Sequence, residues 1–364
     1  MPTVVVLGAT GAVGRLFVAS MAATGLARLR LGVRHPASDA AHDLAAAGHD
    51  VRGVELWEQS SLDALTEGCA LLVNCLGPAY RTRGRIASAA LSRHAAYLDP
   101  SGDDTVHARI GALVSGRPVK AAMLTGAGSV PGAFGLLARW LATGMPAPVL
   151  SLSGYVVTDE PIHAGTATEF LLSLLDRPSS AAVWRAGRRA GADGTTTVVR
   201  LPYVAGALET HPYLTRETEA IAVDLRLRDA EFCHAFESGG AALAFLRSMP
   251  DRSRLGGTVR ELAREMTATV NAGMARRTPL HMLAVEAGSD GQRRSAILRS
   301  RSSYQLTASM AVLAAREILA QRVSPGLARA DVLQPALVAE LPALDEMTRL
   351  EVRDGGLGAW AADG

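Results

Sequence analysis

The chain has 364 residues, of which 48% are hydrophobic and 20% are charged, and its formal net charge is +2. A chain of this size can bury one large or two moderate hydrophobic cores, so two domains are expected. The near-neutral charge and the scarcity of aromatic residues exclude a strongly basic surface for nucleic acid, and no nucleic-acid partner is predicted.

No segment approaches the roughly 20 uninterrupted apolar residues of a membrane span, and the N-terminus lacks a basic region with a cleavage site. We therefore expect a cytoplasmic protein with no membrane partner. Cys69, Cys75 and Cys233 are odd in number and lack metal-ligand spacing. We interpret them as buried thiols, and no metal site is predicted.

The first predicted element is a β-branched strand at residues 3–7, which leads into a glycine-rich turn and an apolar helix. In such a unit Gly8 permits the tight turn, Gly11 lets the backbone approach a pyrophosphate, and Gly14 lets the helix pack on the strand. Amides at the helix N-terminus face the anion. The predicted dinucleotide contacts are Gly8, Thr10, Gly11, Ala12, Val13 and Gly14. The G-x-x-G-x-x-G spacing also leaves a plain strand–turn–helix open.

The second strand, residues 27–33, ends at the position that distinguishes the two nicotinamide cofactors. NAD-preferring folds carry an Asp or Glu there for the ribose 2′-hydroxyl, whereas this chain carries Arg34. A guanidinium can stack on adenine and pair with a 2′-phosphate, and Ser38 can add a donor. The sequence therefore predicts NADPH. The alternative is that Arg34 is a solvated surface arginine.

Strand and helix signals continue to alternate as far as about residue 145. Further strands are predicted at 49–54, 70–76, 96–99 and 120–124, with helices at 61–67, 84–92 and 105–115. The continuous apolar run at 70–76 is typical of a central parallel strand. The predicted fold class is α/β, with a Rossmann-type doubly wound parallel sheet in a dinucleotide-binding domain over residues 1–147.

From residue 148 the pattern changes. Segments 149–158, 195–204, 220–226, 281–287 and 295–301 are β-rich, and helices are predicted at 167–175, 240–247 and 259–274. We therefore expect an α+β substrate and dimerisation domain over residues 148–302, with a mostly antiparallel sheet covered on one face by helices. Residues 303–364 are expected to form a C-terminal helix and tail that return to the dinucleotide-binding domain.

Candidate catalytic residues follow from position, because chemistry in a doubly wound sheet gathers at the carboxyl ends of the strands. Asn74 and Gly77 come at the end of the strand at 70–76 and are predicted to contact the cofactor. Tyr80, in the same loop, either donates a proton to the substrate or caps the loop. Asp99 ends the next strand, where it either relays a proton or caps the following helix.

His163 is the histidine chosen as a substrate-domain acid, since its Gly-flanked loop could close over the cofactor. His211 is the competitor, and a structural role is the alternative for each. The surrounding segment 151–166 has few cations and is rich in Tyr, Ser, Thr and His, which suits an aromatic, largely neutral ligand; ordinary loop chemistry is the other interpretation. The loop 126–132 either offers backbone amides to the nicotinamide or substrate, or is a glycine-rich connector.

Several motifs together resemble the saccharopine dehydrogenase-like reductases. They are the runs at residues 8–14 (GATGAVG), 73–78 (VNCLGP), 97–102 (YLDPSG) and 126–132 (GAGSVPG). The segment 304–308, followed by the Ser-Pro-Gly at 324–326, looks like the family's returning helix and the loop after it. The resemblance covers most of the chain, strongly in the first 140 residues and weakly from 150 to 300.

The resemblance implies NADPH-dependent hydride chemistry at carbon–nitrogen bonds. The chain length and the divergent middle domain favour the thiazolinyl imine reductases of enantio-pyochelin-type siderophore assembly, which reduce a thiazoline to a thiazolidine. The substrate would be a small-molecule or carrier-protein-tethered imine, and a homodimer is expected. Two alternatives stay open: a saccharopine-type amino-acid dehydrogenase working in the oxidative direction, and a non-catalytic NADP-binding sensor protein.

Overall fold

The computed structural model describes residues 1–78, 82, 84–101, 104–175, 181–192, 197–254 and 258–363. The chain divides into two compact units, and each is built from two separate stretches of sequence. Unit 1 comprises Met1–Leu136 and Tyr304–Asp345, and unit 2 comprises Leu137–Ser303 and Glu346–Gly364. The boundaries expected from the sequence lie at 147/148 and 302/303, with the whole tail in the first domain.

Unit 1 contains a parallel sheet, which among the described residues has seven strands in the order β15-β6-β5-β4-β1-β2-β3. The strands are β1 (Thr3–Leu7), β2 (Arg28–Val33), β3 (Asp50–Gly53), β4 (Leu71–Asn74), β5 (Ala96–Asp99), β6 (Ala122–Thr125) and β15 (Gly326–Arg329). The strand order reverses beside β1, as in a Rossmann-type sheet. The predicted α/β fold class is thereby confirmed.

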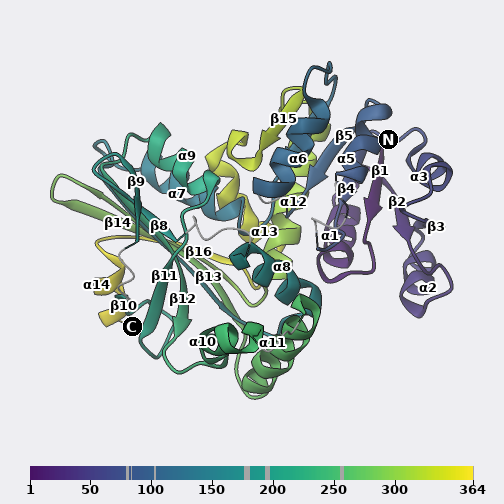
Figure 1. Ribbon diagram of the computed structural model, residues 1–364. Helices are drawn as coiled ribbons and strands as arrows, with labels where there is room; N and C mark the ends of the chain where they lie inside the picture. The colour runs from purple at the N-terminus through teal and green to yellow at the C-terminus, as the bar shows by residue number, and fades with distance from the viewer. Residues whose placement is uncertain are drawn as a thin grey trace. The chain divides into compact units, whose positions relative to one another are not determined.

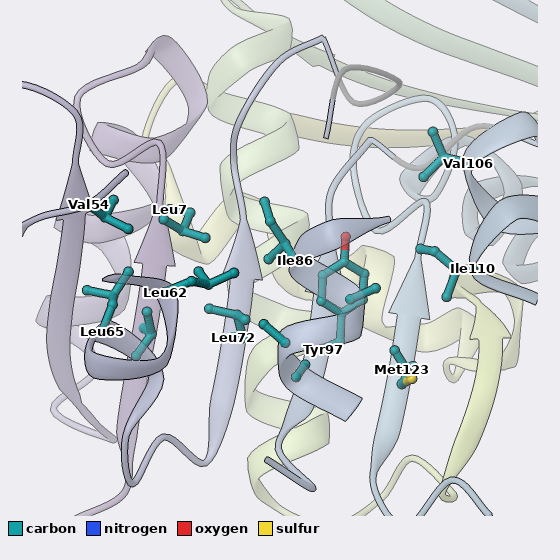
Figure 2. Packing of buried hydrophobic residues seen from close by; sticks show 14 residues of the cluster. Leu7, Val54, Leu62, Leu65, Leu72, Ile86, Tyr97, Val106, Ile110 and Met123 are labelled. Carbon is teal, nitrogen blue, oxygen red and sulfur yellow. The ribbon is translucent and has the colours of Figure 1, made fainter. Parts of the chain in front are cut away.

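Helices follow the strands of unit 1 in alternation (Figure 1). They are α1 (Ala12–Ala23), α2 (Asp39–Ala46), α3 (Gln59–Thr66), α5 (Arg85–Ser92), α6 (Asp104–Val114), α12 (Ser303–Leu319) and α13 (Leu341–Leu344). A further helix, α7 (Ala133–Thr143), begins in unit 1 and continues into unit 2. Figure 2 shows the buried cluster on the strands, in which Leu72 of β4 and Tyr97 of β5 lie with Leu65 of α3 and Ile86 of α5. This packing holds the carboxyl ends of the strands in register.

Unit 2 contains a second, mixed sheet, in which the described strands run in the order β10-β11-β12-β7-β13-β14-β16, with β8 and β9 beside β12. The strands are β7 (Ser151–Asp159), β8 (Ala182–Arg185), β9 (Arg188–Gly191), β10 (Thr197–Val199), β11 (Leu208–Pro212), β12 (Asp229–Glu237), β13 (Leu280–Ser289), β14 (Gln292–Ser300) and β16 (Arg349–Asp354). Among the described strands of unit 2, β12 and β7 pair in parallel and the remaining pairs are antiparallel.

The helices of unit 2 are α8 (Ala164–Leu175), α9 (Arg216–Asp224), α10 (Ala241–Arg254), α11 (Val259–Met274) and α14 (Leu357–Ala362). α8, α10 and α11 share an apolar cluster that includes Leu171, Phe245 and Leu262. A separate cluster joins Met282 and other residues of the sheet to Trp360 of α14. The predicted second layer of helices is therefore present, and a further apolar cluster joins the sheet to α14.

Several parts of unit 2 differ from the sequence-based expectation. The strands β8, β9, β11 and β12 have no counterpart among the predicted strands. Residues 220–226 were expected to form a strand, but they lie at the end of α9 and beyond it. Thr215 and Thr218 form a capping box that starts this helix, and such reciprocal hydrogen bonds favour a helix over a strand. The tail also differs, because β16 pairs with β14 along residues 349–354 and so belongs to unit 2.

Among the described residues, no helix is long and apolar enough to cross a bilayer.

Candidate functional site

The glycine turn after β1 has the close contacts that the motif predicts. Gly8 has φ +82°, and a Cβ on it would lie 2.6 Å from the Cys75 carbonyl oxygen. A Cβ on Gly14 would lie 2.0 Å from the Gly8 carbonyl oxygen. Gly11 donates its amide to that same oxygen over 2.9 Å and begins α1 with no side-chain cap. The amides of the first turn of α1 thus stay available to an anion.

The other predicted contacts in this turn lie on the surface of unit 1. Thr10 and Gly11 are exposed, while Ala12 and Val13 are half-buried in the first turn of α1. The structure therefore brings the predicted pyrophosphate contacts together around the N-terminus of α1, where the turn is accessible to solvent. A side chain on Gly8 or Gly14 would collide with neighbouring backbone, so these glycines let the first turn of α1 pack closely on the end of β1, as in a dinucleotide-binding turn.

Arg34 follows β2 directly and is exposed. Within the described part of the chain its guanidinium makes no ion pair or side-chain hydrogen bond. Ser38 precedes α2, and its hydroxyl donates to the His35 carbonyl oxygen over 2.8 Å. Arg34 is thus uncommitted and can pair with a 2′-phosphate, whereas the hydroxyl proton of Ser38 stabilises the local turn.

The carboxyl ends of β4 and β5 carry a buried polar network. Asn74 donates its side-chain amide to Asp99 Oδ2 over 2.9 Å and to the Tyr97 hydroxyl over 3.3 Å. The Tyr97 hydroxyl donates to the same carboxylate oxygen over 2.9 Å. Asp99 Oδ1 accepts the Ser101 amide over 3.0 Å. Two predicted site residues, Asn74 and Asp99, are therefore in direct contact.

The burial of this network decides what it can do chemically. Asp99 is fully buried and Asn74 is 1% exposed, so their side chains are enclosed in the unit. Burial, followed by the nearby Asp99 charge, raises the pKa of Tyr97 well above its ordinary value. The phenol therefore stays protonated and acts as a permanent donor to the carboxylate. Such a network orients the loops after β4 and β5 and holds their backbone in place.

Gly77 lies in the loop after β4 and is exposed, as a residue that contacts a cofactor must be. Tyr80, the predicted proton donor in the same loop, lies outside the described residues. Cys75 lies between Asn74 and Gly77, and burial raises the pKa of its thiol above the ordinary value, with Asp99 adding to the effect. This thiol is therefore protonated at neutral pH and unreactive as a nucleophile.

The glycine-rich loop after β6 folds onto itself. The Gly128 amide donates to the Pro131 carbonyl over 3.0 Å, and the Ala127 amide donates to the Asp99 carbonyl over 3.2 Å. The Ser129 amide donates to the Thr307 hydroxyl of α12 over 3.2 Å. These three amides are used within unit 1. The connector interpretation therefore describes them better than a direct contact with nicotinamide or substrate.

A histidine that the sequence analysis did not select lies at the carboxyl end of the same sheet. His107 of α6 has its Nδ1 2.8 Å from the hydroxyl of Thr125, the buried last residue of β6. Burial and the nearby Arg329 lower the pKa of His107. Its place inside the predicted helix at 105–115 gives little signal in sequence. Asp99 of β5 pairs with Thr125 of β6, so the contact between His107 and Thr125 lies at the same end of the sheet as Asp99.

The histidines chosen in unit 2 lie in different places. His163 is exposed at the start of α8, and the backbone of the preceding Ile162 is held by Asn271 of α11 through bonds of 2.8 and 3.1 Å. Glu160 accepts the Ser303 amide, so the loop is also anchored there. His211 on β11 packs edge-on against Phe236. Partial burial lowers the pKa of His211.

The low cation content expected from segment 151–166 does not describe unit 2 as a whole. A cavity in this unit is lined by four arginines that come from other parts of the sequence: Arg277, Arg299, Arg301 and Arg349. Local composition missed them because the sheet assembles residues that are far apart along the chain. Among the described residues, no group of three or more His, Cys, Asp or Glu is arranged to hold a metal ion.

Comparison with known proteins agrees with this geometry. Residues 4–117 match the family model described as the saccharopine dehydrogenase NADP binding domain. No curated protein matches the chain by sequence. The apo saccharopine dehydrogenase (L-Glu forming) from Saccharomyces cerevisiae is similar in structure, with a TM-score of 0.68 at 14% identity, covering 98% of this chain and 100% of that one. An engineered D-amino acid dehydrogenase gives a TM-score of 0.49 at 14% identity, covering 93% and 96%.

Proposed function

We propose that the chain is an oxidoreductase that reduces a carbon–nitrogen double bond with NADPH. The match of residues 4–117 to the saccharopine dehydrogenase NADP binding domain supports this choice of cofactor. The substrate we propose is a thiazolinyl imine, which becomes a thiazolidine during siderophore biosynthesis. It reaches the protein either free or tethered to a carrier protein.

The observation that carries the proposal is the combination of a glycine turn and an uncommitted arginine in one unit. Gly8 and Gly14 let the first turn of α1 pack closely on the end of β1, and the uncapped amides of that turn suit a pyrophosphate. Arg34 follows β2 without a carboxylate partner in the described structure, which suits a 2′-phosphate. These residues would hold NADPH, and when bound it supplies the hydride equivalent for reduction.

The chain's own residues supply the remaining requirements of imine reduction. The imine nitrogen must receive a proton, and we assign this donation to Tyr80, with His163 as the second candidate. The buried Asn74–Tyr97–Asp99 network positions the loops after β4 and β5. Asp99 is fully buried, and we propose that it supports the site through these hydrogen bonds instead of by touching the substrate.

A largely neutral, aromatic substrate is supported by the composition of β7, in which the one charged residue, Asp159, is paired with Arg277. Burial raises the pKa of Tyr155 on this strand to about 12, so its hydroxyl stays a neutral donor at every physiological pH. Ser153 lies on the same strand. Neutral donors of this kind match the ring nitrogen and phenol of a hydroxyphenyl-thiazoline and leave no buried charge unpaired.

The test is the loss of NADPH absorbance with the purified protein and a panel of imines. The panel includes a hydroxyphenyl-thiazolinyl thioester mimic, and saccharopine with NADP⁺ is run as the reverse contrast. We expect turnover of the thiazoline alone. Turnover of saccharopine would assign the protein to amino-acid oxidation, and tight NADPH binding with no turnover of either would support a sensor.

A Tyr80→Phe variant tests the proposed proton donor. We expect kcat to fall by about a hundredfold, in line with the usual contribution of general acid catalysis, while the Kd for NADPH stays unchanged. His163→Ala is the parallel variant. If both variants turn over the thiazoline at the wild-type rate, the proton comes from another group.

A further inference from the structure

Unit 2 contains a cavity of about 790 Å³ whose lining residues all belong to that unit. The cavity is lined by the carboxyl ends of β7, β12 and β14, the first turn of α10 and the last turn of α11. Figure 1 shows α10 and α11 beside the ends of β11 and β12. Cavities of roughly 300–1,000 Å³ are the size of small-molecule sites. Neither the proposed reaction nor the predicted residues use this cavity.

The charges that line the cavity do not cancel. Four arginines face it together with two carboxylates, Asp159 and Glu237. Arg277 lies 2.8 Å from Asp159 and 2.5 Å from Glu237, so a single arginine satisfies both acids. The other three arginines have no partner among the carboxylates that line the cavity.

The three remaining arginines differ in their partners. Arg299 lies 3.0 Å from Glu351, outside the lining, and its guanidinium lies 4.2 Å from the centre of the Tyr203 ring. Arg349 donates to backbone carbonyl oxygens, at 2.8 Å in the case of Thr348. Arg301 is exposed and makes no hydrogen bond or ion pair within the described residues. Arg301 and Arg349 thus have no carboxylate partner.

The rest of the lining is mainly apolar. Val157 of β7, Ala235 of β12, Val270 and Met274 of α11 and Leu280 of β13 all contribute side chains. The first-turn residues of α10 also face the cavity, and the amides at a helix N-terminus favour negative charge. One cavity therefore combines an apolar wall with cationic groups that lack a counter-ion.

We propose that unit 2 binds, in this cavity, a small molecule that carries one anionic group on an apolar body. Arg301 and Arg349 bind the anionic group, which is a carboxylate or a phosphate, because guanidinium pairs with either in a two-pronged geometry. The apolar body contacts Val157, Val270 and Met274. The inference does not depend on imine reduction, since it concerns residues of unit 2 alone.

The experiment is isothermal titration calorimetry of the full chain with octanoate, octyl phosphate and octanamide. These three molecules share one apolar body and differ only at the head group. We expect at least one of the two anions to bind and octanamide to bind about tenfold more weakly or not at all. Tighter binding of octyl phosphate identifies a phosphate ligand, and tighter binding of octanoate identifies a carboxylate. Failure of both anions to bind, or equal affinity for octanamide, would overturn the proposal.

Variants locate the binding in the cavity. Arg301→Gln and Arg349→Gln should each raise the Kd of the bound anion by about fivefold to tenfold, because each removes one charge-assisted contact. Ala205→Trp, at an exposed lining position, should block the cavity without changing its charge. Arg353→Gln is the matched control, since Arg353 lies on the same strand outside the lining and faces Trp360.

An unchanged Kd in all three cavity variants would refute the assignment. A separate NADPH titration of each variant checks that unit 1 is folded. Because that titration is read independently, a protein that binds NADPH and octanoate but reduces no imine would refute the proposed function and leave this site intact. A protein that reduces imines and binds neither anion would do the reverse.

Discussion

The pH dependence of stability should depend strongly on His281, a residue of β13 that is 2% exposed. Its Nδ1 lies 3.0 Å from the Thr158 hydroxyl on the neighbouring strand. Burial, and then the neighbouring His234, lower its pKa from 6.5 to about 4. The perturbation is a fall in pH from 7 to 5, applied to the wild type and to His281→Gln.

The sign follows from proton binding in the two states. Between pH 6.5 and about 4 the unfolded chain binds a proton at this histidine that the folded chain does not bind. Stability is therefore lost as the pH falls through 6.5, and the loss levels off near pH 4. The lowered pKa corresponds to about 3 kcal/mol in total, of which about 2 kcal/mol is lost between pH 7 and pH 5.

Other groups in unit 2 also contribute to the pH profile, so the difference between the two proteins is the useful quantity. Burial lowers the pKa of His234 to about 4, which acts in the same direction. Burial raises the pKa of Asp159 and Glu160, and this favours the folded state as the pH falls. These contributions are shared by wild type and variant, apart from the coupling between the two histidines.

The assay is urea unfolding at pH 7 and pH 5. On going to pH 5 the wild type should lose about 2 kcal/mol more unfolding free energy than His281→Gln. His42→Gln, at an exposed histidine, is the control and should behave as the wild type does. If His281→Gln and the wild type lose the same free energy, the buried neutral histidine is not the cause of the pH dependence.

Three further outcomes are expected. Gly14→Ala should weaken NADPH binding by at least about tenfold and destabilise the protein by about 1–3 kcal/mol, because the new Cβ would lie 2.0 Å from a backbone oxygen. Fluorescence titration measures the NADPH affinity and urea unfolding measures the stability, with Gly358→Ala, where the space is open, as the control. Arg34→Asp should raise the Kd for NADPH about tenfold and lower that for NADH, and unchanged cofactor preference would contradict the assignment. Asn74→Ala should cost about 2 kcal/mol in urea unfolding, since the buried Asp99 loses a donor; a loss below about 0.5 kcal/mol would mean that water replaces the amide.

Unit 1 was predictable because its signals are local and agree with one another. A β-branched strand followed by closely spaced glycines specifies one turn, and apolar runs such as Leu71–Asn74 specify buried parallel strands. The contact between Asn74 and Asp99 follows from two strand ends in one parallel sheet. Tyr97 escaped notice because its role depends on alternation: it lies two residues before Asp99, on the same face of β5.

Unit 2 was less predictable because its strands are identified by their partners more than by their own composition. β11 and β12 contain polar residues such as Glu209 and Glu231, so their period-2 pattern is weak. α9 carries β-branched residues that favour a strand, and the capping box at Thr215 overrides that preference. The arginines of the cavity lie between residues 277 and 349, so no single window of sequence contains them.

The interleaved order of the two units bears on synthesis of the chain. β15, which pairs with β6 at the edge of the first sheet, is made only after residues 137–303 have left the ribosome. During that interval the edge of β6 has no partner from its own sheet, and an open strand edge invites pairing with another nascent chain. β16 comes later still and closes the edge of β14. Unit 1 therefore completes its sheet only when residues 326–329 have been translated, and unit 2 only when residues 349–354 have been translated. A chain that terminates before these strands should be retained by chaperones or degraded.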